Sequence, residues 1–290
     1  MNKLFQRFLL NCAIGIFKLI PFWLLYRLSD VLYFLLYYIV RVRRKVVRAN
    51  LEFIFSNYSR HQIKKIERES YRNFCDIILE TAKGFTLSPE VMAQRYKISN
   101  PELIEPYYQQ QRSIIGFIAH MNNWEWGISL QRSLKHKAFY IYKRLHNRVA
   151  DTFIREKRQV SGAELIHKEQ MARVLIKNRR IPGFYALIAD QRPSGDQEQL
   201  QVNFFNRNIS CFAGPEKIAK TFDYPVIYCK IERIKRGYYT CTGVLITDAP
   251  KNTCDGEISQ HCFKLLEQQI KEQPGSWMWM HQRFKGMIVK

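Results

Sequence analysis

A chain of 290 residues can form one large domain or two small ones, and its 47% content of hydrophobic residues is enough for a core. It has 46 Lys and Arg against 25 Asp and Glu, a formal net charge of +21. This surplus indicates a polyanionic partner: a nucleic acid, an anionic membrane surface or a phosphorylated lipid. The seven cysteines are scattered without any Cys-x-x-Cys, which argues against a disulfide framework or zinc ribbon and favours reduced thiols facing the cytosol.

The N-terminal segment contains two apolar runs, residues 8–25 and 31–40, both rich in aromatic side chains. Each is short or interrupted for a bilayer span of about 20 residues, and no small-residue cleavage site follows the first run as in a secretory signal. A basic cluster comes next: Arg41, Arg43, Arg44, Lys45 and Arg48. Cations beside an apolar segment are typical of the cytoplasmic face of a membrane. Residues 1–48 therefore predict a membrane anchor that spans or lies on the bilayer, the alternative being a soluble helical hairpin.

The rest of the chain, residues 49–290, is predicted to form one domain. An amphipathic helix is expected over 61–83, ended by Gly84. From residue 113 onward strand-like and helix-like pieces alternate. Strands are expected at 113–119, 138–142, 183–189, 200–205, 225–234 and 238–247, and helices at 124–134, 148–160, 169–177, 215–222 and 258–271. The pattern predicts an α/β fold with a mixed central sheet flanked by helices.

A histidine follows the first of these strands. His120 stands where a core strand ends, and open α/β sheets place ligand sites at the carboxyl ends of their strands. Glu125, five residues later, could bind one ring nitrogen and leave the other free to accept a proton. The spacing also allows another interpretation, in which Glu125 and Asn122 form a capping box that only satisfies backbone donors. The spacing alone leaves both open.

The segment from Ala119 to Gly127, Ala-His-Met-Asn-Asn-Trp-Glu-Trp-Gly, resembles the His-x-x-x-x-Asp/Glu motif of lysophospholipid acyltransferases. More narrowly, it resembles the bacterial late acyltransferases that acylate lipid A precursors. Four further segments are similar to that family. Residues 43–51 resemble its Arg-Arg-x-x-x-x-x-Asn-Leu segment, and residues 142–147 resemble its Tyr-Arg-x-x-x-Asn block. Asp190-Gln191 resembles its Asp-Gln or Asp-His pair, and residues 277–285 resemble its closing Trp-x-His-Arg-Arg-Phe/Trp-Lys element. The resemblance covers nearly the whole chain.

The resemblance implies a glycerol-3-phosphate acyltransferase-like fold at the inner membrane, with the catalytic domain facing the cytoplasm. It also implies that His120 acts as general base on a hydroxyl of an anionic lipid acceptor, with Glu125 orienting the imidazole. The hydroxyl would attack the thioester of an acyl carrier protein or coenzyme A. No covalent acyl-enzyme, cofactor or metal is expected, and the chain contains neither a Gly-x-Ser-x-Gly elbow nor His-Glu-x-x-His.

Five further residues are candidates for substrate binding. Arg158 is the leading one for the oxyanion or a lipid phosphate, and Arg144 is a second for phosphate. Lys143 stands where the family usually has arginine, and lysine lacks the bidentate fork. Asp190, with Gln191, either supports His120 or a substrate hydroxyl, or begins the turn at 192–196.

The closing block departs from the family pattern. Gln282 replaces the first of two arginines usually found there, and Arg283 keeps the second. Trp277 and Trp279 are at least as well explained by packing on the sheet as by a site.

Other functions remain open at this point. A close alternative is acylation of another bacterial lipid, such as a lysophospholipid, aminolipid or glycolipid. A basic nucleic-acid-binding protein is a remote alternative, because no reading motif is present and the apolar anchor stays unexplained. A catalytically silent membrane scaffold would not need His120 and Glu125.

Overall fold

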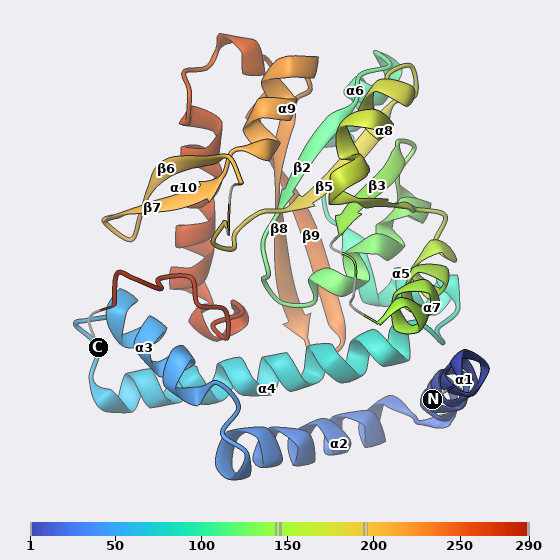
Figure 1. Cartoon of the computed structure of the whole chain (residues 1–290), viewed down its shortest axis with the longest axis vertical. Coiled ribbons are helices and arrows are strands. Elements are labelled where there is room, and N and C mark those ends of the chain that lie inside the picture. Colours follow the sequence, from blue (N-terminus) through green and yellow to red (C-terminus); the bar gives the residue numbers. More distant parts are fainter. Residues whose placement is uncertain (1, 143, 145–146, 194, 196, 289–290) are drawn as a thin grey trace.

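A seven-stranded mixed sheet forms the centre of the computed structural model, which describes residues 2–288 except 143, 145, 146, 194 and 196 (Figure 1). In spatial order the strands are β1 (Tyr96–Ile98), β9 (Tyr238–Thr247), β8 (Val226–Lys235), β2 (Ile114–Ile118), β5 (Gly183–Ile188), β3 (Lys137–Tyr142) and β4 (Glu164–His167). The strands from β8 to β4 are parallel, whereas β9 and β1 run the opposite way. The α/β fold with a mixed central sheet is therefore confirmed.

Helices flank the sheet on both sides and run across one end of it (Figure 1). The long helix α4 (Arg60–Gly84) begins at a capping box between Ser59 and Gln62 and crosses the base of the sheet. The others after it are α5 (Pro89–Arg95), α6 (Glu105–Gln109), α7 (Arg148–Gln159), α8 (Met171–Lys177), α9 (Gly214–Phe222) and α10 (Glu257–Glu272). The helix expected at 124–134 is a 3₁₀ helix, η3 (Trp124–Ser133). A separate hairpin pairs β6 (Gln199–Phe204) with β7 (Arg207–Phe212).

The core lies on both faces of the sheet. Strand β2 is buried at every position, as expected for a central parallel strand covered on both sides. Gly116 is required in this strand, because a Cβ atom there would come within 2.4 Å of the Phe184 ring. The rigid centre of the sheet thus fixes where the chain leaves β2, and the next residues carry the site.

The N-terminal segment forms α1 (Lys3–Leu19), α2 (Phe22–Phe34), a π-helical turn η1 (Leu35–Ile39) and α3 (Arg44–Ile54). Helix α2 packs along α4 (Figure 1). Within the described residues, one helical stretch, Phe22–Ile39, is long and apolar enough to cross a membrane by length and composition alone. The predicted apolar N-terminal helix is therefore present. Val47 and Leu51 belong to the main core, and the division of the chain at residue 48 stays a prediction.

Candidate active site

His120 and Asp190 meet at the carboxyl ends of two neighbouring strands. Strand β2 leads into His120, and β5 leads into Asp190 and Gln191. The two strands are parallel and in register, with Ile118 opposite Ile188. The carbonyl of Ile118 also accepts a hydrogen bond from the Ala189 amide at 3.2 Å, which extends the pairing to the edge of the site. Residues 70 positions apart in sequence are thereby brought together.

The imidazole of His120 is held on both of its nitrogens. Nδ1 lies 2.6 Å from Oδ1 of Asp190, and the side-chain amide nitrogen of Gln191 lies 3.2 Å from Nε2. A carboxylate can only accept, so Nδ1 carries the proton and Nε2 presents a lone pair, to which the Gln191 amide donates. The His120 side chain is 16% exposed, so this lone pair is within reach of a substrate. In this tautomer the imidazole can act as a base at Nε2.

Asp190 is buried and fully bonded. Its Oδ2 accepts hydrogen bonds from the His120 amide at 3.1 Å and from the indole Nε1 of Trp277 at 2.7 Å. Burial raises the pKa of the Asp190 carboxyl, but the attraction of the His120 imidazole in its protonated form and the hydrogen bonds from His120 and Trp277 outweigh it and hold that pKa below its ordinary value. Asp190 therefore stays ionised, fixing the imidazole tautomer.

The turn after His120 is built from two asparagines. Asn122 has a φ of 49°, in the left-handed region that asparagine tolerates better than most residues, and its side chain donates to the Ile231 carbonyl at 2.8 Å. Asn123 caps η3 by accepting from the Trp126 amide at 3.0 Å. The Trp124 ring packs edge-on against the His120 ring, with 4.9 Å between ring centroids. The His-x-x-x-x-Glu segment is thus a strand end, a tight turn and a capped helix start.

The carboxylate of Glu125 has a different partner from the one expected. Its carboxylate forms an ion pair with the guanidinium of Arg158 on α7, and Asp190 occupies the ring nitrogen that Glu125 was expected to hold. The reason is local: because Asn123 caps η3, Glu125 lies in the first helical turn, where its side chain reaches α7. The structure supports neither a Glu125–imidazole bond nor a capping box with Asn122, since the cap is Asn123. The sequence allowed Asp190 either to support the site or to begin the turn at 192–196, and in the structure its carboxylate binds His120.

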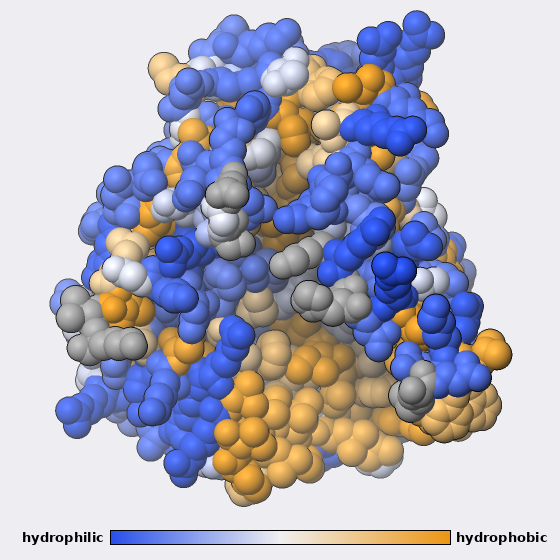
Figure 2. Space-filling model, viewed as in Figure 1, coloured by the Kyte–Doolittle hydropathy of each residue, from blue (hydrophilic) through white to orange (hydrophobic). Residues whose placement is uncertain are grey.

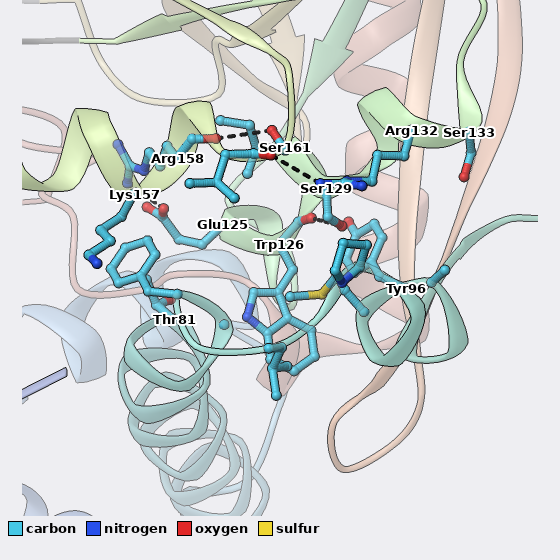
Figure 3. A pocket seen from close by; sticks show the side chains of 18 residues that line it. Thr81, Tyr96, Glu125, Trp126, Ser129, Arg132, Ser133, Lys157, Arg158 and Ser161 are labelled. Carbon is cyan, nitrogen blue, oxygen red and sulfur yellow. Dashed lines mark hydrogen bonds and ion pairs between the residues drawn. The ribbon is translucent and has the colours of Figure 1, made fainter. Parts of the chain in front are cut away.

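A pocket lies beside the Glu125–Arg158 pair (Figure 3). It is bounded by η3, α5, the end of α4 and α7, and its cavity volume is about 110 Å³. Most of its wall is apolar, formed by Phe85, Leu87, Met92, Trp126, Ile128 and Val160 among others, and the polar part includes Arg132, Lys157 and several hydroxyl side chains besides the ion pair. Tyr96 lines this pocket and also a second, strongly apolar cavity between η3 and the sheet. An apolar chain with a polar head at the ion pair matches this lining.

Glu80 is a residue that the sequence interpretation missed. It is fully buried on α4, and its carboxylate accepts hydrogen bonds from Asn123 at 2.7 Å, Tyr239 at 2.7 Å and Tyr26 at 3.0 Å. Burial raises the pKa of this carboxyl, against the hydrogen bonds from Tyr239 and Asn123. A carboxylate within the amphipathic stretch 61–83 was the available signal. Glu80 links α2, the site turn and β9.

The remaining predicted residues are more dispersed. Arg144 is exposed just after β3, and Lys143 lies outside the described residues. Gln282 is exposed, whereas Arg283 is buried and donates to the Ser210 carbonyl at 2.8 Å. The indole of Trp277 has a direct role at Asp190, which the packing interpretation did not foresee. The structure therefore joins His120, Asp190 and Gln191 in one cluster and Glu125 with Arg158 in another.

Comparison with known proteins agrees with this arrangement. A family model described as bacterial lipid A biosynthesis acyltransferase matches residues 1–286, essentially the whole chain. A search of curated proteins gives no match.

Proposed function

Because the chain belongs to the bacterial lipid A biosynthesis acyltransferase family, we propose that it moves a fatty acyl chain from an acyl thioester to a hydroxyl of a lipid A precursor. The observation that carries the proposal is the imidazole of His120, held by Asp190 on Nδ1 and presenting Nε2 at the edge of the sheet. Family membership indicates an acyltransferase, and the histidine supplies the base that acyl transfer to an alcohol requires.

The reaction proceeds by direct transfer. The acceptor hydroxyl replaces the Gln191 amide at Nε2 of His120, which takes the hydroxyl proton as the oxygen attacks the thioester carbonyl. The tetrahedral intermediate then collapses, the carbon–sulfur bond breaks, and the thiolate leaves and takes up the proton from the imidazolium. Asp190 stabilises the imidazolium between these steps without itself taking the proton. The products are an ester and a free thiol.

We propose Arg158 as the source of positive charge for this reaction. Its side chain is 21% exposed and its guanidinium is oriented by Glu125, so we propose that it meets a substrate anion. We assign it to the developing oxyanion or to a phosphate of the acceptor, where a preoriented donor is most effective. Glu125 is then a positioning residue that acts through Arg158. Arg144 is kept as a second candidate for phosphate.

The pocket beside Glu125 is the proposed place of the acyl chain. Its wall is more apolar than polar, and we place the thioester at its Glu125–Arg158 ion pair. Fatty chains are recognised by such apolar surface, with polar groups fixing the reactive end.

The charge of the chain fits both proposed substrates. A formal net charge of +21 attracts the acidic surface of an acyl carrier protein and the phosphates of a lipid A precursor. We propose the acyl carrier protein as donor, with coenzyme A as the alternative thioester carrier. The apolar N-terminal helix is consistent with membrane association, and the proposed location is the inner membrane with the site facing the cytoplasm.

The direct test uses the purified full-length chain in vesicles of phosphatidylethanolamine and phosphatidylglycerol. Acyl carrier protein thioesters or coenzyme A thioesters are offered together with either a lipid A precursor or a lysophospholipid, and products are identified by mass spectrometry. Ester formation on the lipid A precursor supports the proposal. Exclusive acylation of the lysophospholipid would reassign the acceptor, and absence of transfer to either acceptor would refute the function.

A further inference from the structure

Helix α2 is attached to the protein along one face. Leu25, Ser29, Tyr33 and Tyr37 follow one another at intervals of four residues, and all are buried against the domain. Four-residue spacing places side chains on one face of a helix. The inner face of the Phe22–Ile39 stretch is therefore in contact with the protein over most of its length.

Polar bonds fix this face to the domain. Ser29 donates to Asp76 of α4 at 2.6 Å, and Asp30 pairs with Arg236 at 2.7 Å. Tyr26 donates to Glu80, the carboxylate that also holds Asn123 of the site turn. Ser29, Asp76 and Glu80 are buried, whereas Asp30 and Arg236 are partly exposed, and together these bonds give α2 a defined position on α4. Removing the helix would break bonds that reach the active-site turn.

The preceding helix is attached as well. Lys83 at the end of α4 donates to the carbonyls of Phe17 and Lys18 at 2.8 and 3.1 Å, which fixes the junction of α1 and α2. Near the start of α1, Arg7 pairs with Glu156 of α7 at 2.7 Å. Both helices thus follow the surface of the domain.

The outer face of the same helices is apolar. In the described part of the chain, 14 of the 22 large exposed hydrophobic side chains lie in residues 2–40. On α2 and η1 they include Trp23, Leu28, Val31, Phe34 and Ile39. Figure 2 shows this apolar surface at the base of the molecule, over α2 and α1, with hydrophilic surface around it. Contiguous exposed apolar surface of this kind marks an interaction site.

Positive charge predominates around this face. Residues 2–50 contain nine Lys and Arg and one acid, Asp30, which is paired with Arg236. Arg7, Arg44 and Arg48 are paired with Glu156 and Glu67, and the exposed cations that remain include Lys3, Lys18, Arg27, Arg41 and Lys45. An apolar face with a cationic border fits the surface of an anionic bilayer. The occupant is therefore a lipid leaflet containing anionic phospholipid.

A transmembrane orientation of α2 conflicts with these contacts. Arg27 and Asp30 lie near the middle of Phe22–Ile39, and placing a charge at the centre of a bilayer is energetically costly. If α2 kept its contacts while crossing, it would carry Asp76 and Arg236 into the hydrocarbon. If it crossed alone, it would lose the bonds to Asp76, Glu80 and Arg236.

We infer that α1, α2 and η1 lie in the plane of one leaflet, with the outer apolar face in the lipid and the inner face on α4. The inference deepens the membrane association in the proposed function and is independent of the acyl-transfer chemistry. In this arrangement both ends of the chain stay on the same side of the membrane as the site.

The experiment measures sidedness in the full-length protein in bacterial cells. Of the seven cysteines, only Cys12 and Cys254 are exposed. The first protein carries Cys12→Ser, which leaves Cys254 as the reporter of the catalytic domain. The second carries Cys12→Ser and Cys254→Ser together with a short hydrophilic extension before Met1. A single cysteine in that extension reports the position of the N-terminus. Each protein is treated with a membrane-impermeant maleimide in spheroplasts and in inverted membrane vesicles.

We expect both reporters to react in inverted vesicles and neither to react in spheroplasts. Reaction of the N-terminal reporter in spheroplasts, with Cys254 protected there, overturns the inference. Recovery of both proteins in the soluble fraction overturns membrane association altogether. Acyl-transfer activity of the same preparations is a separate readout, so loss of the proposed chemistry and loss of the proposed orientation are distinguishable.

A depth measurement excludes a hairpin in which both helices cross the membrane. Nitroxide labels are attached in turn at cysteines replacing Trp23, Val31 and Ile39, all exposed on the outer face, in the doubly substituted background. An in-plane helix places the three labels at similar depth. A crossing helix of 18 residues extends about 27 Å and places the Val31 label near the bilayer centre, with the other two near opposite surfaces. A difference in depth of this kind among the three labels would overturn the inference.

Discussion

The carboxylate of Asp190 binds His120 twice, at the ring Nδ1 through Oδ1 at 2.6 Å and at the backbone amide through Oδ2 at 3.1 Å. One bond sets the tautomer of the imidazole, and the other fixes the backbone from which the ring projects. Both partners leave the sheet from adjacent parallel strands, so their positions are set by the core. Asp190 is therefore the positioning residue for the proposed base.

Asp190→Asn is expected to lower kcat by about 10²- to 10⁴-fold with little change in KM. An amide in place of the carboxylate favours the wrong imidazole tautomer and no longer stabilises the imidazolium. Steady-state kinetics with acyl thioester and lipid acceptor measure the effect. Asp248→Asn, at an exposed position away from the site, is the matched control and should keep wild-type rates. A KM effect alone would place Asp190 in substrate binding.

The pH dependence of stability gives an independent check on Asp190. Its folded-state pKa lies below the ordinary value, so the ionised form stabilises the folded protein above about pH 4, and this contribution is lost as the pH falls through the folded-state pKa. Asp190→Asn should lower the free energy of unfolding by about 2 kcal/mol at pH 7, the size expected for hydrogen bonds to a charged group. Denaturant unfolding between pH 3 and 7 should show this difference narrowing toward pH 3. A constant difference would contradict the ionised assignment.

Glu125→Gln and Arg158→Lys test the second cluster. Arg158→Lys loses the guanidinium fork and should lower kcat/KM by about 10²-fold, as for loss of one oxyanion donor. Glu125→Gln should have a smaller effect, and the double variant should resemble Arg158→Lys alone, because Glu125 acts through Arg158. The pH profile of kcat/KM should be unchanged in Glu125→Gln. If instead that profile shifts and kcat falls as in Asp190→Asn, then Glu125 acts on the imidazole.

Much of the fold could be predicted because strands and helices here have clear periodic patterns. The strands at 113–119 and 183–189 stand out as apolar runs, one followed by His120 and the other by the polar pair Asp190-Gln191, which also located the candidate site. The partner of Glu125 could not be predicted, because spacing along one turn does not say which way a side chain points. The direction of the Glu125 side chain depends on which residue caps η3. In the structure this residue is Asn123, and the sequence equally allowed Asn122. The burial of Glu80 depends on tertiary contacts with β9 and α2.

Glu80 should tolerate loss of its charge but not of its side chain. Glu80→Gln keeps an oxygen acceptor and removes a buried charge whose pKa is raised by burial, so we expect it to fold with stability close to the wild type. Glu80→Ala leaves Asn123 and Tyr239 without their acceptor and should cost about 1–3 kcal/mol. Thermal or denaturant unfolding distinguishes the two. Equal destabilisation by both variants would show that the charge itself is needed.

The pocket assignment predicts a change in acyl-chain preference. Ser129 lines the pocket on η3, and Ser129→Phe would fill part of its volume. Transfer of long chains should fall by at least about 10-fold relative to short ones, since each buried CH₂ contributes about 0.8 kcal/mol. Competition between thioesters of different length measures this ratio. Ser56→Phe on the surface is the control, and an unchanged ratio in Ser129→Phe would move the acyl chain elsewhere.

The most direct test of the proposed chemistry is the rate of ester formation on a lipid A precursor by His120→Ala, measured beside the wild type in the same vesicles. Our mechanism predicts a rate at least about 10³-fold lower, because the general base is removed, with unchanged vesicle binding and an unchanged unfolding transition. Ester formation by folded, vesicle-bound His120→Ala at the wild-type rate would contradict the role of His120 as the base.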